Sequence, residues 1–335
     1  MKQAMLTALA LLTLFLLLPA LLVGDAPAAA LLPPSPPAPG ETAGPSAPLP
    51  ELDRTVTLRV KKADGNVYTT TMDKYLPGVV AAEMPAAFEG EALKSQAIAA
   101  RTYAYSKLSS SSSAHPDADL CTDYACCQAW RSESDVKSGW GNNADAYWQK
   151  IASAVAATDG QVVLYEGQPI RAVFFSSAEG RTNAAVEVWG SDVPYLTGVD
   201  TPEGNEVPNF HSTVEMTAEE FKAAFLSKYP GADLSGEPAG WFGACEYSSS
   251  GGVSAIPVGG VRLSGSELRT LLGLRSANFR VAVEGQTITF TVTGYGHGVG
   301  MSQYGANAMA KTGADCAAIL THYYSGVTIA PYPDL

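Results

Sequence analysis

Basic residues are scarce in this chain of 335 residues, where 21 Lys and Arg stand against 33 Asp and Glu, a formal net charge of −12. Proteins that bind nucleic acid need a basic patch to contact phosphates, and the sequence has no Lys- or Arg-rich run. It also lacks an internal repeat and a glycine loop of the kind that cradles phosphates. We therefore expect no nucleic-acid partner and no organic cofactor.

An uncharged apolar run extends from residue 4 to residue 23, directly after a short start that contains Lys2. As a helix it would span roughly 30 Å, the thickness of a bilayer core, whereas signal peptides have a shorter apolar region of about 7–15 residues. We favour a single-pass anchor with residues 1–3 in the cytoplasm. The alternative is a signal peptide that is cleaved within residues 26–30. No cysteine follows the run directly, so no lipid attachment is indicated.

Residues 24–51 are rich in proline, alanine and glycine, a composition typical of a semi-extended spacer. The rest of the chain, residues 52–333, has the hydrophobic content of a globular domain. With either fate of the N-terminal segment, this domain is expected to lie outside the cytoplasm, held at the cell membrane if the anchor stays uncleaved.

Helices and hairpins are interspersed along the domain, which favours the α+β class, with a helical core and antiparallel strands. Asp64-Gly65 predicts a hairpin. A helix capped by Asp73 is expected to end before Pro85, followed by a second helix over residues 89–108. Further helices are predicted over residues 144–158, 217–229 and 315–324, and strands within 161–177, 253–263, 278–293 and 327–330.

Glu83 is a carboxylate in apolar surroundings. It directly precedes Met84-Pro85 and lies between the alanine pairs 81–82 and 86–87. Desolvation disfavours the charged form of a carboxyl group and raises its pKa. Cleavage of a glycosidic bond requires a proton on the departing oxygen, which a carboxylic acid can supply near neutral pH if its pKa is raised. Glu83 is therefore a candidate general acid; the alternative is a structural role at a helix end.

Three segments, residues 75–104, 174–202 and 294–329, together resemble the stage II sporulation protein D family. The resemblance spans essentially the whole domain. It implies a membrane-anchored lytic transglycosylase that cleaves peptidoglycan glycan strands between MurNAc and GlcNAc and leaves 1,6-anhydroMurNAc ends. It also implies that Glu83, in the motif EMP, is the catalytic acid and base of a glycan-binding cleft.

The same resemblance implies a role in engulfment during sporulation, an amidase partner that strips stem peptides from the strands, and possible dimerisation. Two alternatives remain open. One is a hydrolysing muramidase, whose second carboxylate would be Glu89, Glu91, Asp192 or Asp200. The other is a non-catalytic amidase enhancer, a function described for some relatives.

Polar residues of the three segments are candidates for binding the glycan. Lys94 and Arg101 are two helical turns apart and so share one face. A glycine-rich stretch around His297 precedes a helix and would bring polar groups together. Each group has a structural alternative. Lys94 and Arg101 could form a solvated basic face, the hydroxyls of the second segment could cap a hairpin end, and His297 could be a structural loop histidine. The candidate set is Lys94, Gln96, Arg101, Ser176, Ser177, Arg181, His297, Ser302, Gln303 and Tyr304.

The chain has five cysteines, and three of them lie close together in the sequence with a histidine. His115, Cys121, Cys126 and Cys127 offer three thiolates and an imidazole, the donor set of a tetrahedral zinc site. The spacing is not that of a standard zinc finger, but it resembles metal-containing members of the family. Four protein ligands would make the zinc structural. The alternative is a disulfide, with Cys121–Cys127 as the feasible pair.

Overall fold

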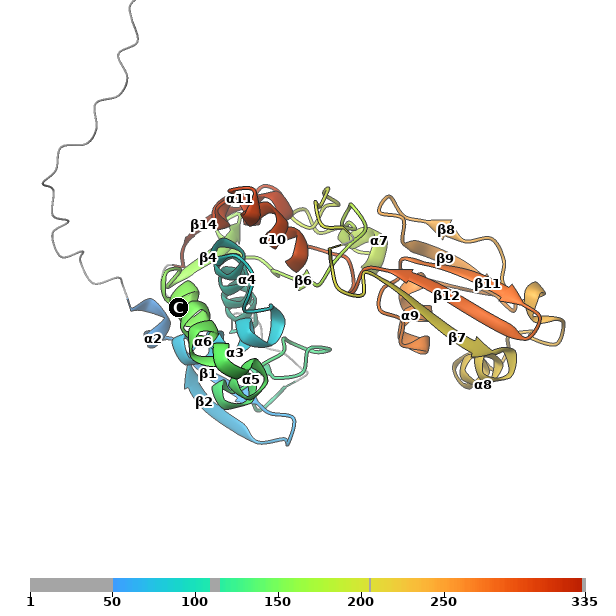
Figure 1. Cartoon of the computed structure of the whole chain (residues 1–335), viewed down its shortest axis with the longest axis horizontal. Helices are drawn as coiled ribbons and strands as arrows, with labels where there is room; N and C mark the ends of the chain where they lie inside the picture. Colours follow the sequence, from blue (N-terminus) through green and yellow to red (C-terminus); the bar gives the residue numbers. More distant parts are fainter. Residues whose placement is uncertain (1–50, 109–114, 205, 333–335) are drawn as a thin grey trace, which may run out of the picture. The chain divides into compact units, whose positions relative to one another are not determined.

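Figure 1 shows a computed structural model of the chain, which describes residues 51–108, 115–204 and 206–332. In these residues helices alternate with short strands that form five small sheets, so the predicted α+β class is confirmed. The predicted cytoplasmic end, the apolar anchor and nearly all of the linker lie outside the described residues. In the described part of the chain, no helix has both the length and the apolarity to cross a membrane.

A β-hairpin lies near the start of the domain, as Asp64-Gly65 predicts. Strand β1 (Thr57–Lys61) pairs antiparallel with β2 (Val67–Thr71). Gly65 has a φ of +86°, a left-handed conformation that glycine adopts without a side-chain clash. The Asp64 carboxylate accepts the backbone N–H of Asn66 at 2.9 Å, which stabilises the turn.

Helix α3 (Met72–Glu83) follows the hairpin and ends where the proline predicts. Met84 is extended, with φ −117° and ψ 142°, as expected for a residue before proline. Glu83 therefore occupies the last position of the helix. The predicted cap was wrong: Thr71 is the N-cap residue, and Asp73 lies in the first turn, where it accepts the Thr71 hydroxyl at 2.5 Å.

The second predicted helix, α4 (Gly90–Leu108), lies in the centre of a helical core (Figure 1). Its residues Ala97, Ala100 and Ala104 are fully buried. Small side chains at these positions allow neighbouring elements to approach closely. The elements in contact with α4 are α3, α6 (Ala144–Ala156), β4 (Gln161–Tyr165), β5 (Gln168–Pro169), α10 (Gln303–Lys311) and α11 (Cys316–Tyr323).

Residues 211–293 have a separate hydrophobic cluster, and we call them the β lobe. Strands β7 (His211–Thr217) and β11 (Phe279–Glu284) pair antiparallel with the two edges of β12 (Thr287–Thr293) (Figure 1). Helix α8 (Ala218–Lys228) contacts β7 and β12. His211 pairs with Thr293, so the lobe begins and ends at neighbouring positions.

Several short elements complete the domain. Helices α5 and α9 were not predicted. The parallel pair of β6 (Phe174–Phe175) and β13 (Met301–Ser302) links the second and third motif segments. The other elements are α2 (Leu52–Thr55), β3 (Leu120–Cys121), α5 (Glu133–Trp140), η1 (Gly141–Asn143), α7 (Ala185–Trp189), η2 (Pro238–Gly240), β8 (Glu246–Tyr247), β9 (Val253–Val258), β10 (Val261–Leu263), α9 (Gly265–Leu272) and β14 (Thr328–Pro331).

Candidate active site

Glu83 is partly buried at the end of α3, and its carboxylate is held by a hydrogen bond from the chain backbone. Oε1 accepts the N–H of Ala129 at 2.7 Å. Desolvation raises the pKa of Glu83 above the usual value for glutamate, while the hydrogen bonds from Ala129 and from the Gln303 side chain act in the opposite direction. Because desolvation outweighs both, a larger fraction of Glu83 is protonated near neutral pH than for an exposed glutamate.

Two glutamines from other helices lie against this carboxyl group. Gln303 begins α10 and hydrogen-bonds to Glu83 through its side chain. Its Nε2 also lies 3.4 Å from Oε1 of Gln96, a fully buried residue of α4. The Nε2 of Gln96 has no hydrogen-bond partner among the described residues. The structure thus brings together one carboxyl group and two amides, with one buried donor still available.

The position of Gln303 depends on the glycine-rich stretch before α10. Gly296 has a φ of +117°, and a Cβ there would lie 2.6 Å from the Cβ of Phe175. Gly300 has a φ of +75°, and a Cβ there would lie 2.2 Å from the carbonyl oxygen of Val173. Larger residues would clash at both positions, so glycine allows the stretch to pack against this chain segment.

Ser302 caps α10 and was predicted to bind substrate, but its hydroxyl is used within the protein. It is fully buried, and its Oγ accepts the N–H of Gly305 at 3.2 Å and donates to the carboxylate of Glu203. Glu203 is itself buried and also accepts the Thr201 hydroxyl and, at 2.8 Å, the N–H of Ala178. Ser302 therefore positions α10 and is not available to the glycan, which corrects the prediction.

Arg101 also has a structural position instead of the predicted substrate contact. Its side chain is fully buried, and its guanidinium pairs with Asp53 at 2.7 Å. It donates further hydrogen bonds to the carbonyls of Val155 and Gln161, at 3.3 and 3.1 Å. Lys94, predicted on the same face, is partly exposed and pairs with Glu91 at 2.7 Å.

The candidates of the second motif lie next to the third. The carbonyl oxygen of Ser176 accepts the N–H of Tyr304 at 3.1 Å. Ser177 is buried and pairs through its backbone with Tyr295, and its hydroxyl has no partner among the described residues. The guanidinium of Arg181 is engaged by Asp200 and by the Gly198 carbonyl, both at 2.6 Å, which is a structural role in the loop.

His297 lies between two aromatic rings, with centroid distances of 5.6 Å to Phe175 and 5.7 Å to Trp189. Its Nδ1 accepts the N–H of Val299 at 3.2 Å. Desolvation, together with the charges of Arg269 and Arg171, lowers the pKa of His297 to about 4. The imidazole is therefore neutral at pH 7.

Tyr304, next to Gln303, packs edge-on against Phe88 with centroids 4.9 Å apart. Its position beside Gln303 keeps it a candidate for contact with substrate. Two features of this site were missed from the sequence, the Ala129 N–H and the Glu203 carboxylate. Neither gives a sequence signal, because a backbone donor has no side-chain signature and Glu203 lies in a loop without periodicity.

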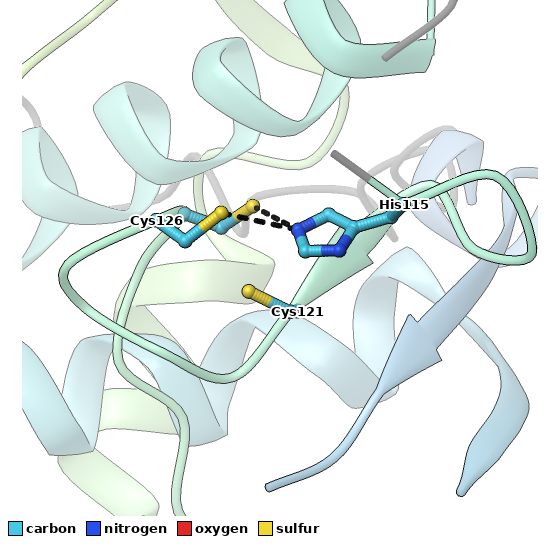
Figure 2. A group of neighbouring side chains, drawn as sticks. His115, Cys121 and Cys126 are labelled. Carbon is cyan, nitrogen blue, oxygen red and sulfur yellow. Dashed lines mark hydrogen bonds between the residues drawn. The ribbon is translucent and has the colours of Figure 1, made fainter. Parts of the chain in front are cut away.

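The four predicted metal ligands converge. One donor atom from each of His115, Cys121, Cys126 and Cys127 lies within 4.8 Å of all the others. Figure 2 shows these side chains turned toward one another, with the His115 Nε2 3.2 Å from the Cys126 Sγ and 3.6 Å from the Cys127 Sγ. A tetrahedral zinc site with Zn–S bonds of about 2.3 Å places its sulfurs about 3.8 Å apart. The donor set and its spacing therefore fit zinc, and all five cysteines are free thiols in this structure.

Comparison with known proteins gives consistent matches. A family model described as "Stage II sporulation protein" matches residues 61–165. The stage II sporulation protein D of Bacillus subtilis (strain 168) is 39% identical over 271 residues, which cover 81% of this chain and 77% of the relative. That of Bacillus amyloliquefaciens is 37% identical over 291 residues, or 87% and 83% of the two chains. An amidase enhancer of Bacillus subtilis (strain 168) is 29% identical over 305 residues, or 77% of this chain and 40% of that relative.

Proposed function

Because this chain belongs to the stage II sporulation protein D family, we propose that it is a lytic transglycosylase that cleaves peptidoglycan glycan strands during sporulation. The observation that carries the proposal is the raised pKa of Glu83 in a desolvated position with amide neighbours. The first step of glycosidic cleavage requires a proton donor, and a carboxyl group with a raised pKa is suited to that role. The finding is independent of the sequence similarity.

Glu83 would act twice in the reaction. In its neutral form it donates its proton to the glycosidic oxygen as the bond from that oxygen to C1 of MurNAc breaks, which releases the GlcNAc hydroxyl. The resulting carboxylate then accepts the proton of the C6 hydroxyl of the same MurNAc, whose oxygen bonds to C1. Glu83 is again protonated, no water is consumed, and the product has a 1,6-anhydro ring.

The neighbours of Glu83 are suited to hold the carboxylate that forms between the two steps. The Ala129 N–H and the Gln303 amide both hydrogen-bond to it. Hydrogen bonds to an ionised group are about twice as strong as neutral ones, so these donors stabilise the anion more than the acid. The buried Nε2 of Gln96 has no hydrogen-bond partner among the described residues and is a further amide donor in the surroundings of Gln303.

A hydrolysing muramidase would need a second carboxylate to activate water. Two of the candidates are engaged elsewhere: Glu91 pairs with Lys94 and accepts the N–H of Cys316 at 3.0 Å, and Asp200 pairs with Arg181. This pairing argues against Glu91 and Asp200 as the second carboxylate. The amidase enhancer among the relatives supports a second candidate function, stimulation of an amidase without glycan cleavage.

Zinc bound by His115, Cys121, Cys126 and Cys127 is part of the proposal. With four protein ligands it would supply no open position for chemistry, only a fixed loop. The same loop carries Ala129, two residues after Cys127, which donates to Glu83. The four ligands would thus help to hold the Ala129 N–H at its position against the carboxylate.

The remaining parts of the proposal concern location and partners. Residues 4–23 would anchor the chain in the cell membrane, with the domain outside the cytoplasm. The substrate would be strands from which an amidase has removed stem peptides. An amidase would accordingly be a functional partner, and a homodimer is compatible with the proposal.

Glu83→Gln tests the proposal, because it keeps the shape of the side chain and removes the transferable proton. The full-length chain is incubated with purified glycan strands, and the released fragments are identified by mass spectrometry. We expect the rate of release of anhydro-ended fragments to fall by about 10²–10⁴-fold. Glu219→Gln is the matched control, since Glu219 is exposed on the β lobe and loses the same charge, and it should keep the wild-type rate.

The products separate the alternatives. Release of anhydro ends at the wild-type rate by Glu83→Gln would refute the catalytic role. Reducing ends from the wild-type protein would identify a hydrolysing muramidase. A wild-type protein that releases no glycan but accelerates an amidase would be an enhancer.

A further inference from the structure

Three arginines around the third motif have no acidic partner. Arg171, Arg269 and Arg275 form no ion pair with any carboxylate of the described residues. Acidic residues outnumber basic ones in this chain, so partners are abundant. Cations that remain unpaired in an acidic protein are available for an anion from outside.

Two of these arginines come from the β lobe and are held in place by contacts that leave their charge uncompensated. The Nε of Arg269 donates to the carbonyls of Leu274 and Arg275, both at 3.2 Å. The guanidinium of Arg275 lies 4.0 Å from the ring centroid of Tyr295, and its buried Nε has no hydrogen-bond partner among the described residues. A buried donor without a partner costs stability unless a ligand satisfies it.

The arginines lie around the glycine-rich stretch that precedes α10. The Arg275 carbonyl accepts the N–H of Gly296 at 2.9 Å, within the glycine-rich stretch that leads to Gln303. Arg275 is near enough for its charge to act on the hydroxyl of Tyr304, next to Gln303. Arg269 and Arg171 both act on His297 in the same way, and no carboxylate contributes to the pKa of that imidazole. His297 is thus a point that the charges of two of the arginines reach, from the β lobe and from residue 171.

Exposed aromatic rings accompany the cations. Tyr295 is 44% exposed, and the Arg275 guanidinium lies over its ring. Trp189 is 41% exposed, with Arg171 5.7 Å from its ring centroid. Tyr and Trp present an apolar ring together with a polar tip, which suits the apolar faces and hydroxyl rims of pyranose rings.

We propose that Arg171, Arg269 and Arg275 form a three-arginine site that binds carboxylates carried by the glycan strand, while Tyr295 and Trp189 pack against its sugar rings. The guanidinium group matches a carboxylate with two parallel hydrogen bonds. The inference rests on the proposed function, because it takes the strand as the ligand. On a strand stripped of its stem peptides the carboxylate is the lactyl group of MurNAc, whereas on an unstripped strand it would belong to the stem peptide.

The experiment measures binding without cleavage. The full-length chain in detergent, with Glu83→Gln as background, is titrated with three fluorescent strands of equal length. One has free lactyl carboxylates, one bears stem peptides, and one has its carboxylates chemically reduced. Arg275→Gln and Arg269→Gln are compared with the background, and Arg262→Gln is the matched control because Arg262 pairs with Glu246 on the same lobe.

Each arginine variant is expected to bind one carboxylated strand about tenfold more weakly, as for the loss of a charge-assisted hydrogen-bond pair. Binding of the reduced strand and of the Arg262→Gln control should be unchanged. Arg275→Lys retains the charge and should recover part of the affinity. Weakening with the denuded strand alone identifies the lactyl group, and weakening with the peptide-bearing strand alone identifies the stem peptide.

Equal affinity of variants and background for all three strands would overturn the inference, and so would equal weakening for all three, which indicates a structural effect. Because no turnover is measured, the result is separate from the proposed catalysis. If the wild-type protein cleaves glycan but carboxylated and reduced strands bind equally well, the role of Glu83 stands and only the three-arginine site is refuted.

Discussion

Replacement of Arg101 by methionine should destabilise the domain, not remove a substrate contact. The side chains of Arg101 and Asp53 are 0% and 1% exposed, and Nη2 of the arginine lies 2.7 Å from the carboxylate. Methionine fills a similar volume but provides none of the hydrogen bonds. Asp53 would remain buried, and its carboxylate would keep the hydrogen bond from the backbone N–H of Gly160, at 3.4 Å. The backbone N–H of Asp53 itself donates to Asp159 and so does not help its carboxylate.

The expected cost follows from the burial of both groups. Removal of one partner of a buried ion pair costs about 3–5 kcal/mol, because the other charge is left uncompensated. In a domain of this size each kcal/mol lowers the Tm by about 2–4 °C, so a decrease of about 6–20 °C is expected. The exposed pair of Arg262 and Glu246 provides the control, since Arg262→Met should cost no more than about 1 kcal/mol.

The destabilisation should depend on pH. Desolvation already raises the pKa of Asp53, and Arg101 opposes that shift. Without Arg101 the pKa of Asp53 in the folded state rises further, so the folded variant binds more protons than the unfolded chain. Its stability therefore increases as the pH falls through the folded pKa toward the unfolded one, and the deficit relative to wild type shrinks.

Urea denaturation of the wild type and of Arg101→Met measures the difference in their free energies of unfolding, at pH values from neutral down to the pKa of Asp53 in the unfolded chain. The double variant Asp53→Leu, Arg101→Met should recover most of the lost stability, because no buried charge remains. The reasoning would be refuted by an Arg101→Met protein that unfolds at the wild-type urea midpoint yet no longer cleaves glycan. That outcome would return Arg101 to the substrate-binding role predicted from the sequence.

Two further predictions concern the surroundings of Glu83. Gln303→Met removes a hydrogen bond that lowers the pKa of Glu83, so the alkaline limb of the pH–activity profile should move to higher pH; an unmoved limb would contradict the contact. Purified protein should contain one zinc per chain by metal analysis, and chelation should lower the Tm, since metal binding to the folded state stabilises it. A zinc-free, active protein with a Cys121–Cys127 disulfide would contradict the metal site.

Features set by neighbouring residues were predictable from the sequence. The turn at Asp64-Gly65 and the end of α3 before Pro85 are decided by local backbone preferences. The four converging ligands, His115 to Cys127, lie within one short segment, so their donor set and the family resemblance suggested a shared site. Glu83 was a candidate because its apolar neighbours are adjacent in the chain, and the family resemblance of the EMP motif singled it out.

Features that depend on distant segments were not predictable. Arg101 was placed on the correct helix, but its partner Asp53 is 48 residues away and no pattern indicates it. Glu203 receives its hydrogen bonds from three separate segments. Arg269 and Arg275 became candidates for anion binding because no carboxylate of the described residues pairs with them, and such pairing depends on the folded arrangement. Helix α9 was different, since its Ser264 and Glu267 form a capping box, which is a signal of a helix start in the sequence itself.

The β lobe begins and ends at a paired position, with His211 opposite Thr293 and the N–H of Gly294 bonded to the carbonyl of Phe210 at 2.8 Å. In topological terms the lobe is an insertion, and the helical core would close with almost any length of chain between these two points. Evolution can therefore exchange or reshape the lobe without rebuilding the residues around Glu83. The acid and the two lobe arginines of the proposed site, Arg269 and Arg275, can therefore vary independently.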